Sequence, residues 1–156
     1  MKKTALAIAS ALLLLTACDS SSDSDANGNG TGFNGNISEA QRQFAANVGD
    51  RVFFALDSST LSGEAQATLD RQAGWLKENS GVNIVIEGHA DERGTREYNI
   101  ALGERRATAA KNYLVNLGVA ASRLSTVSYG KERPAVMGSD DSAWSQNRRA
   151  VTVLAN

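Results

Sequence analysis

Asp91 and Arg106 are the residues whose types and spacing point most clearly to binding chemistry. Asp91 follows an apolar segment typical of a strand, whereas Arg106 shares one face of an expected helix with Asn99 and Leu102, at spacings of 3 and 4 residues. An arginine beside an apolar stripe requires a carboxylate partner, from the protein or from a ligand. Two interpretations stay open. Asp91 and Arg106 form a structural salt bridge, or they bind a free amino acid group, with Asp91 accepting the ammonium and Arg106 holding the carboxylate through two parallel hydrogen bonds.

The composition argues against several other functions. The chain has one His and one Cys, too few ligands for a structural zinc site, and no serine or free cysteine lies in a recognisable nucleophile motif. We therefore expect no catalytic residue, metal or cofactor, although a hydrolase that uses His89 together with Asp91 stays open as an alternative. Lys and Arg number 16 against 17 Asp and Glu, so the net charge of −1 gives no basic field for a nucleic acid.

The hydrophobic pattern predicts an α+β domain over residues 38–156 that positions these side chains. Apolar or alternating runs predict strands, and stripes with helical spacing predict helices, in the order β-α-β-α-β-β. The expected elements are a buried strand at 52–56, a helix from Ser62 to the stop at 79–81, a strand at 82–88, a helix at 98–117 and strands at 124–129 and 150–154. We expect a two-layer sandwich with a mixed sheet and helices packed on one face, and one further helical turn near 142–146.

The N-terminal residues predict export and lipidation. Lys2 and Lys3 precede an apolar run at 5–15 that is too short to span a bilayer, and the sequence then reads Leu-Thr-Ala-Cys at 15–18. This segment resembles the bacterial lipobox, so residues 1–17 are expected to be a lipoprotein signal peptide, and Cys18 to carry a diacylglyceryl group and an N-acyl chain. A plain signal peptide with an incidental cysteine is the alternative. Residues 18–37 are expected to be the lipidated Cys and a flexible polar linker, because they contain almost no side chain able to form a core.

The stretch around Asp91 resembles the OmpA-like peptidoglycan-binding domain family. The family pattern is carried by Gly88-His89-Ala90-Asp91, Gly94, Asn99-x-x-Leu102-Gly103-x-x-Arg106-Ala107, an opening Phe53-Phe54-x-x-Asp57 and a closing Asn147-Arg148-Arg149. The resemblance covers residues 50–154. Gly103 stands where the family usually has Ser, which we expect to weaken the helix, and Ala150 stands where a larger aliphatic side chain is common.

The resemblance implies a non-enzymatic role in the cell envelope. It implies that Asp91 and Arg106 bind the diaminopimelate of the peptidoglycan stem peptide, and that the same site is lined by Asp57, Thr95, Asn99 and Leu102. Lipoprotein members of the family are anchored in the outer membrane by their lipid, face the periplasm and bind a periplasmic partner of the Tol system, with a role in envelope integrity and cell division. Asp19, directly after the lipidated cysteine, favours the inner membrane in some bacteria; we expect the outer membrane.

Overall fold

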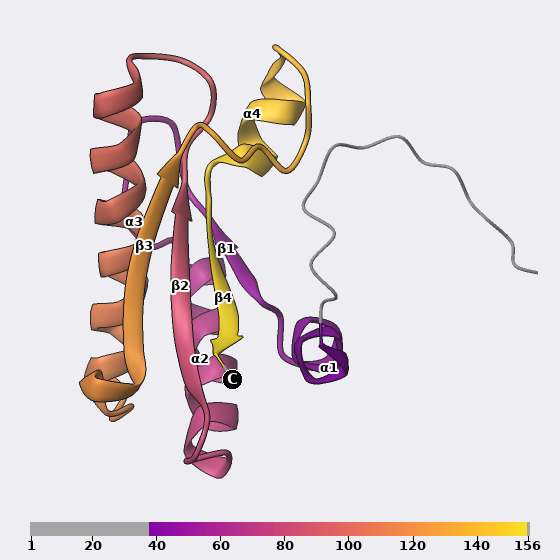
Figure 1. Ribbon diagram of the computed structural model, residues 1–156, viewed down its shortest axis with the longest axis vertical. Coiled ribbons are helices and arrows are strands. Elements are labelled where there is room, and N and C mark those ends of the chain that lie inside the picture. The colour runs from indigo at the N-terminus through magenta and orange to yellow at the C-terminus, as the bar shows by residue number, and fades with distance from the viewer. Residues whose placement is uncertain (1–37, 156) are drawn as a thin grey trace, which may run out of the picture. The chain divides into compact units, whose positions relative to one another are not determined.

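The computed structural model describes residues 38–155. Its elements are α1 (Glu39–Asn47), β1 (Arg51–Phe53), α2 (Gly63–Glu78), β2 (Asn83–His89), α3 (Arg96–Asn116), the 3-10 turn η1 (Ala121–Arg123), β3 (Leu124–Gly130), α4 (Asp141–Asn147) and β4 (Arg149–Ala155). The strands form one sheet in the order β1-β4-β2-β3 (Figure 1). β4 runs antiparallel to both β1 and β2, whereas β2 and β3 are parallel. The α+β class and the mixed sheet are therefore confirmed.

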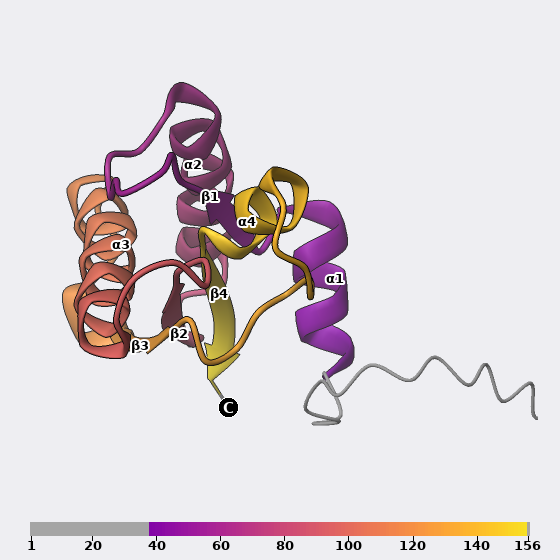
Figure 2. The ribbon, with the colours of Figure 1, turned by 90° about the horizontal axis from the view of Figure 1, so that it is seen from above.

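The core lies between one face of the sheet and helices α2 and α3. Ile84 and Ile86 of β2 point to this side and are 1% and 0% exposed, and Ala150 of β4 is buried in the same cluster. Figure 2 shows α2 and α3 on one side of the sheet, with α1 and α4 away from α3. The expectation that the two predicted helices, which are α2 and α3, pack on one face of the sheet is therefore confirmed, whereas α1 and α4 bury few apolar residues.

Helix α2 follows the prediction closely. The hydroxyl of Ser62 accepts a hydrogen bond from the backbone N–H of Ala65 at 3.2 Å and so caps the first turn. The helix ends at Glu78, with Asn79 as its C-cap. Its predicted stripe faces the core and consists of Ala65, Leu69, Ala73 and Leu76, none of them more than 4% exposed.

Helix α3 begins two residues earlier than the pattern predicts, because Thr95 caps it. The hydroxyl of Thr95 accepts from the backbone N–H of Tyr98 at 3.2 Å, which places the first turn at Arg96. Of two neighbouring arginines on this helix, Arg105 is exposed and Arg106 is 0% exposed. The helix packs on β2 and β3, which brings Arg106 to the end of β2.

The prediction of a buried strand at 52–56 is wrong in length and burial. Only Arg51–Phe53 forms a strand, and it pairs with β4 alone, at the edge of the sheet. Phe53 is 46% exposed, because side chains alternate along a strand and only one face of β1 lies against the core. Leu56 is 60% exposed, because it lies in the loop that follows the strand. The apolar run therefore supplies one core strand residue, Val52, and the buried Phe54, which begins the loop.

Helix α1 was not predicted, and it closes the part of the β4 edge that β1 leaves free. The side-chain amide of Gln41 donates to the carbonyl oxygen of Thr152 at 3.1 Å and accepts from the backbone N–H of Leu154 at 2.7 Å. These bonds replace those of a neighbouring strand. The ring of Phe44 packs edge-on against Trp75 of α2, with ring centroids 4.9 Å apart, and holds the helix in place.

A pair of glycines sets the closest approach of α3 to the sheet. A Cβ atom on Gly88 of β2 would collide with the carbonyl oxygen of Gly103, and a Cβ atom on Gly103 would lie 2.8 Å from the carbonyl oxygen of Gly88. The hydroxyl of Ser128 on β3 lies at the same contact and donates to the carbonyl oxygen of Ile100 at 2.6 Å. Gly103 thus allows backbone contact between helix and sheet, a role that helix propensity alone does not reveal.

The predicted signal peptide, Cys18 and the polar linker lie outside the described residues. Within residues 38–155, no helix is long and apolar enough to cross a membrane.

Candidate functional site

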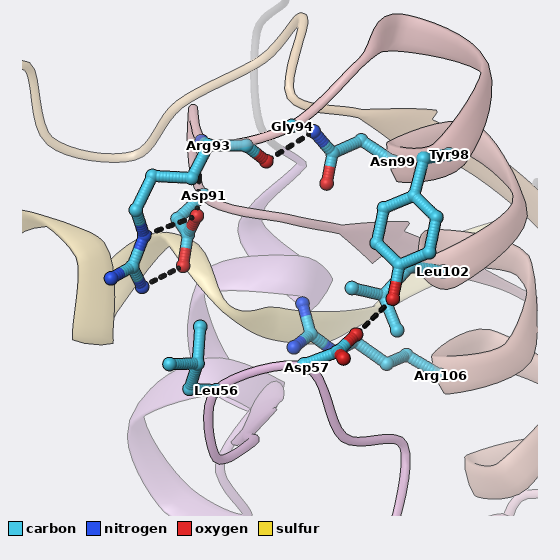
Figure 3. A pocket seen from close by; sticks show the side chains of 9 residues that line it. All are labelled: Leu56, Asp57, Asp91, Arg93, Gly94, Tyr98, Asn99, Leu102 and Arg106. Carbon is cyan, nitrogen blue, oxygen red and sulfur yellow. Dashed lines mark hydrogen bonds and ion pairs between the residues drawn. The ribbon is translucent and has the colours of Figure 1, made fainter.

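A pocket of about 210 Å³ opens where the loops after β1 and β2 meet the first half of α3. Figure 3 shows Asp91 and Arg93 on one side of it, Asp57 and Tyr98 on the other, and Arg106 between them. The residues that line it are Leu56, Asp57, Asp91, Arg93, Gly94, Tyr98, Asn99, Leu102 and Arg106. Of the six residues expected at the site, the structure brings together five; Thr95 is not among the lining residues.

Arg106 is a buried cation held by backbone carbonyl groups. Its Nε donates to the carbonyl oxygen of Ser58 at 2.8 Å, Nη1 to that of His89 at 2.8 Å and Nη2 to that of Ala55 at 3.1 Å. Each terminal nitrogen keeps one further N–H, because a guanidinium has five. Burial, and then the charge of Arg148, lower the pKa of Arg106 to about 10, so the side chain stays charged at neutral pH.

The structural Asp91–Arg106 salt bridge, one of the two interpretations that the sequence leaves open, is not formed. Asp91 Oδ2 lies 2.6 Å from Arg93 Nη2 and 3.4 Å from Arg148 Nη1, and no ion pair of the described residues includes Arg106. Loop geometry explains the difference, since Arg93 is two residues from Asp91 and reaches its carboxylate without leaving the loop. Burial raises the pKa of Asp91, but the hydrogen bonds and the charge of Arg93 outweigh it and hold that pKa below its ordinary value.

Asp57 supplies a second, exposed carboxylate on the other side of the pocket. It accepts a hydrogen bond from the hydroxyl of Tyr98, which also raises the pKa of that phenol. Asp57 has a positive φ of 52°, a conformation that aspartate tolerates better than most residues. The turn directs the carboxylate to α3 and the pocket (Figure 3).

Asn99 and Leu102 line the pocket from α3 as expected, and both are buried. The side-chain amide of Asn99 donates to the carbonyl oxygen of Arg93 at 2.8 Å and fixes the loop backbone. Thr95 has another role, because its hydroxyl caps α3 and so positions the residues that the helix contributes.

The His89 ring lies away from the pocket. It is 2% exposed, Nε2 is 3.6 Å from Glu87, too far for a hydrogen bond, and neither ring nitrogen has a hydrogen-bond partner. Burial, followed by the charge of Arg149, lowers the pKa of His89, although Glu87 opposes this. His89 contributes to the site only through its backbone carbonyl, which binds Arg106. Among the described residues, no cluster of three or more His, Cys, Asp or Glu side chains could hold a metal.

Sequence reasoning did not assign Arg93 and Tyr98 to the site. Arg93 donates to Asp91 and lies over the Trp144 ring at 4.0 Å, while Tyr98 donates to Asp57. The available signal was position, since Arg93 lies in the loop directly after Asp91 and Tyr98 lies in the first turn of the helix that carries Arg106. Arg148, from the closing Asn147-Arg148-Arg149 motif, is only 15% exposed at its side chain, and its Nη1 lies 3.4 Å from Asp91 Oδ2.

The geometry defines a class of protein, a small α+β binding domain whose pocket presents one buried guanidinium between two carboxylates. The sequence matches the model of the OmpA family over residues 53–148. This match covers more than half of the chain, and the chain belongs to the OmpA family.

Curated relatives share the same domain at high identity. The chain is 61% identical over 115 residues to a protein of Rhizobium meliloti named "Peptidoglycan-associated lipoprotein", and the match covers 74% of this chain and 65% of that one. A protein of the same name from Mesorhizobium japonicum is 61% identical over 114 residues, which cover 73% of this chain and 68% of the relative. The chain thus spans about two thirds of the length of these relatives.

Solved structures agree with the fold. The peptidoglycan-associated lipoprotein of Burkholderia pseudomallei is 43% identical, with a TM-score of 0.66 over 68% of this chain and 90% of that one. The C-terminal domain of Helicobacter pylori MotB is 21% identical, with a TM-score of 0.64 over 69% of this chain and 84% of that one, and supports the fold alone.

Proposed function

We propose that this chain is an outer-membrane lipoprotein that binds peptidoglycan non-covalently through the diaminopimelate of the stem peptide. The protein would tether the outer membrane to the cell wall as part of a Tol–Pal system and would not act as an enzyme. The names of its relatives support the association with peptidoglycan and the lipid anchor. The predicted lipobox at Cys18 supports the same lipid anchor, from which the domain would face the periplasm.

The observation that carries the ligand assignment is the buried Arg106. Taking a guanidinium out of water is costly unless an anion or several hydrogen-bond acceptors compensate. Three carbonyl groups compensate in part, and Arg106, which lines the pocket, keeps two N–H groups that match in number the two oxygens of a carboxylate. The free end of diaminopimelate carries a carboxylate and an ammonium on one carbon, so Arg106 would hold the former and Asp91 would accept the latter. Asp57, Asn99 and Leu102 would line the same site, with Thr95 positioning α3.

The pocket does not favour the hydrolase alternative. His89 and Asp91 cannot act as a pair there, because the His89 ring is buried away from the pocket and Asp91 is occupied by two arginines. The purely structural alternative required a direct Asp91–Arg106 bridge, which is not formed.

A titration with two stem peptides tests the proposal. The full chain, purified in detergent, is titrated with a stem peptide that contains diaminopimelate and with one that contains lysine, whose side chain ends in an ammonium without a carboxylate. We expect the lysine peptide to bind much more weakly, and Arg106→Ala to remove about 2–5 kcal/mol of binding free energy for the diaminopimelate peptide. Calorimetry gives both values.

Arg123→Ala is the matched control for this variant. Arg123 also donates to three backbone carbonyl groups, those of Leu76, Asn79 and Val82, but it lies outside the pocket. Both variants lose structural hydrogen bonds, and only Arg106→Ala should lose affinity. Equal binding of both peptides to all three proteins would refute the diaminopimelate site.

A further inference from the structure

The carboxylate of Asp91 is fully occupied without a ligand. Oδ1 accepts from the backbone N–H and from Nε of Arg93, each at 3.1 Å, while Oδ2 accepts from Arg93 Nη2 at 2.6 Å and Arg148 Nη1 at 3.4 Å. A ligand ammonium therefore finds no unused oxygen on Asp91. It can bind there only if one of the two guanidinium groups leaves.

The two arginines differ in their freedom to move. Arg148 is 15% exposed at its side chain, and its Nε also donates to the carbonyl oxygen of Phe54 at 2.9 Å. Arg93 is 35% exposed at its side chain, and its guanidinium hydrogen-bonds Asp91 and lies 4.0 Å from the centre of the Trp144 ring. The nearby charges of Asp141 and Glu92 attract it as well, but no backbone carbonyl is among its hydrogen-bond partners in the described residues. The backbone of Arg93 is fixed by its own bond to Asp91 and by Asn99. Arg93 can thus release Asp91 by rotating its side chain while the loop stays in place.

We propose that Arg93 is an internal substitute for the ligand ammonium, which occupies Asp91 in the free protein and is displaced when diaminopimelate binds. This inference rests on the proposed function and adds a residue that sets affinity and selectivity. Because a ligand must first break the Arg93–Asp91 pair, the measured affinity is lower than the intrinsic one by the fraction of molecules in which Asp91 is free. A neutral group gains nothing from displacing a cation, so Arg93 also rejects ligands without an ammonium.

Removing a polar residue from a binding pocket usually weakens binding, whereas removing Arg93 should strengthen it. In the full chain, Arg93→Ala should bind the diaminopimelate stem peptide about three- to tenfold more tightly than the wild type, because the competing pair is gone. A peptide whose side-chain amine is acetylated should show no such gain. Arg93→Lys keeps the positive charge but cannot make two parallel hydrogen bonds to Asp91. Its affinity for the diaminopimelate peptide should lie between those of the wild type and Arg93→Ala.

Arg96→Ala is the matched control, because it removes the same charge three residues away. Arg96 is 69% exposed at its side chain, pairs with Glu132 and does not line the pocket. If the gain came from a change in overall charge, Arg96→Ala would reproduce it. We expect Arg96→Ala to leave the affinity unchanged.

Fluorescence of Trp144 gives a second readout that a purely structural role would not change. In a Trp75→Phe background Trp144 is the only tryptophan, and release of the stacked guanidinium should change its emission on ligand binding. Arg93→Ala should abolish this change. Binding to Arg93→Ala that is equal to or weaker than the wild type would overturn the inference and leave the proposed function intact. If the wild type bound the diaminopimelate and lysine peptides equally well, both the proposed function and the inference about Arg93 would be refuted.

Discussion

Arg106 combines a structural role with a proposed binding role in one side chain. Its three carbonyl partners come from the loop after β1 and from the end of β2, and its guanidinium carbon lies 5.2 Å from the centre of the Phe54 ring. Such a side chain is already positioned when the ligand arrives, so binding costs little side-chain entropy. Because no carboxylate of the described residues forms a salt bridge with Arg106, its guanidinium keeps two N–H groups that the proposed ligand would use.

His89 should make the stability of the domain depend on pH. Its pKa is below the ordinary value of 6.5 in the folded state, so below pH 6.5 the unfolded chain binds a proton that the folded chain does not. The free energy of unfolding should therefore fall as the pH is lowered through 6.5, with a slope that approaches about 1.4 kcal/mol per pH unit below it. Urea denaturation of the wild type and of His89→Phe, followed between pH 7 and pH 5, measures this slope.

The Phe variant keeps an aromatic ring near Tyr129 and removes the titrating group. Its slope should be much smaller over this range, because the carboxylates whose pKa values are lowered by folding, Glu39, Asp91 and Glu92, take up protons in the unfolded chain mainly below about pH 5. Identical slopes for the two proteins would show that His89 does not titrate as inferred. Glu87, Arg149 and Arg133 influence His89 and are present in both proteins.

The sequence predicted where Arg106 lies, but it did not predict which groups bind Arg106 or Asp91. Helical periodicity places Arg106 beside the buried stripe, and the sequence predicts a carboxylate partner for it. In the structure three backbone carbonyl groups bind it instead. No periodicity governs the loop at 90–95, where the partner of Asp91 is decided by the reach of single side chains. The Arg93–Asp91 pair could therefore not be predicted from spacing.

The contact between α3 and β2 depends on two glycines that face each other. Replacing Gly103 with Ala should destabilise the fold by about 1–3 kcal/mol, although alanine is the better helix former, because the added methyl group meets the carbonyl oxygen of Gly88 and the hydroxyl of Ser128. Thermal or urea denaturation measures the change.

Gly74 of α2 offers the matched control for this substitution. It lies inside a helix, and a Cβ atom there meets nothing within 4 Å. Gly74→Ala should stabilise the domain by about 0.5–1 kcal/mol. If Gly103→Ala were also stabilising, the close contact of α3 with the sheet would not limit the fold.

Elements with a long apolar repeat were predictable, and short ones were not. Helices α2 and α3 bury several residues at helical spacing, so the sequence pattern predicts both. Helix α1 buries only Phe44 and binds the sheet through Gln41, a contact that depends on an unpaired strand edge elsewhere in the chain. β1 was predicted too long, because an apolar run does not show which of its residues face the solvent.

At the scale of the whole molecule, the proposed tether needs a lipid at one end and a wall-binding pocket at the other. Each acyl CH₂ group buried in a bilayer contributes about 0.8 kcal/mol, so a cysteine with several acyl chains is held durably. Cys18→Ala should therefore abolish incorporation of labelled palmitate and move the chain out of the membrane fraction. Labelling followed by separation of the two membranes measures both effects.

Asp19→Ser provides the control for sorting, since it keeps the cysteine and changes the residue next to it. The wild type and this variant should both be labelled and should both be recovered with the outer membrane. Recovery of the wild type in the inner membrane alone would contradict the tether as stated.

The bonds of Arg106 also determine how such a tether would carry tension. A pull on the ligand carboxylate would pass through Arg106 to the backbone at Ala55, Ser58 and His89, and so to the end of β2. β2 is paired on both sides, with β4 and β3, and separating it would break two ladders of hydrogen bonds at once. The load would therefore be shared by the whole sheet. A few hydrogen bonds to the wall would yield first, so that an overloaded link detaches and can form again while the domain stays folded.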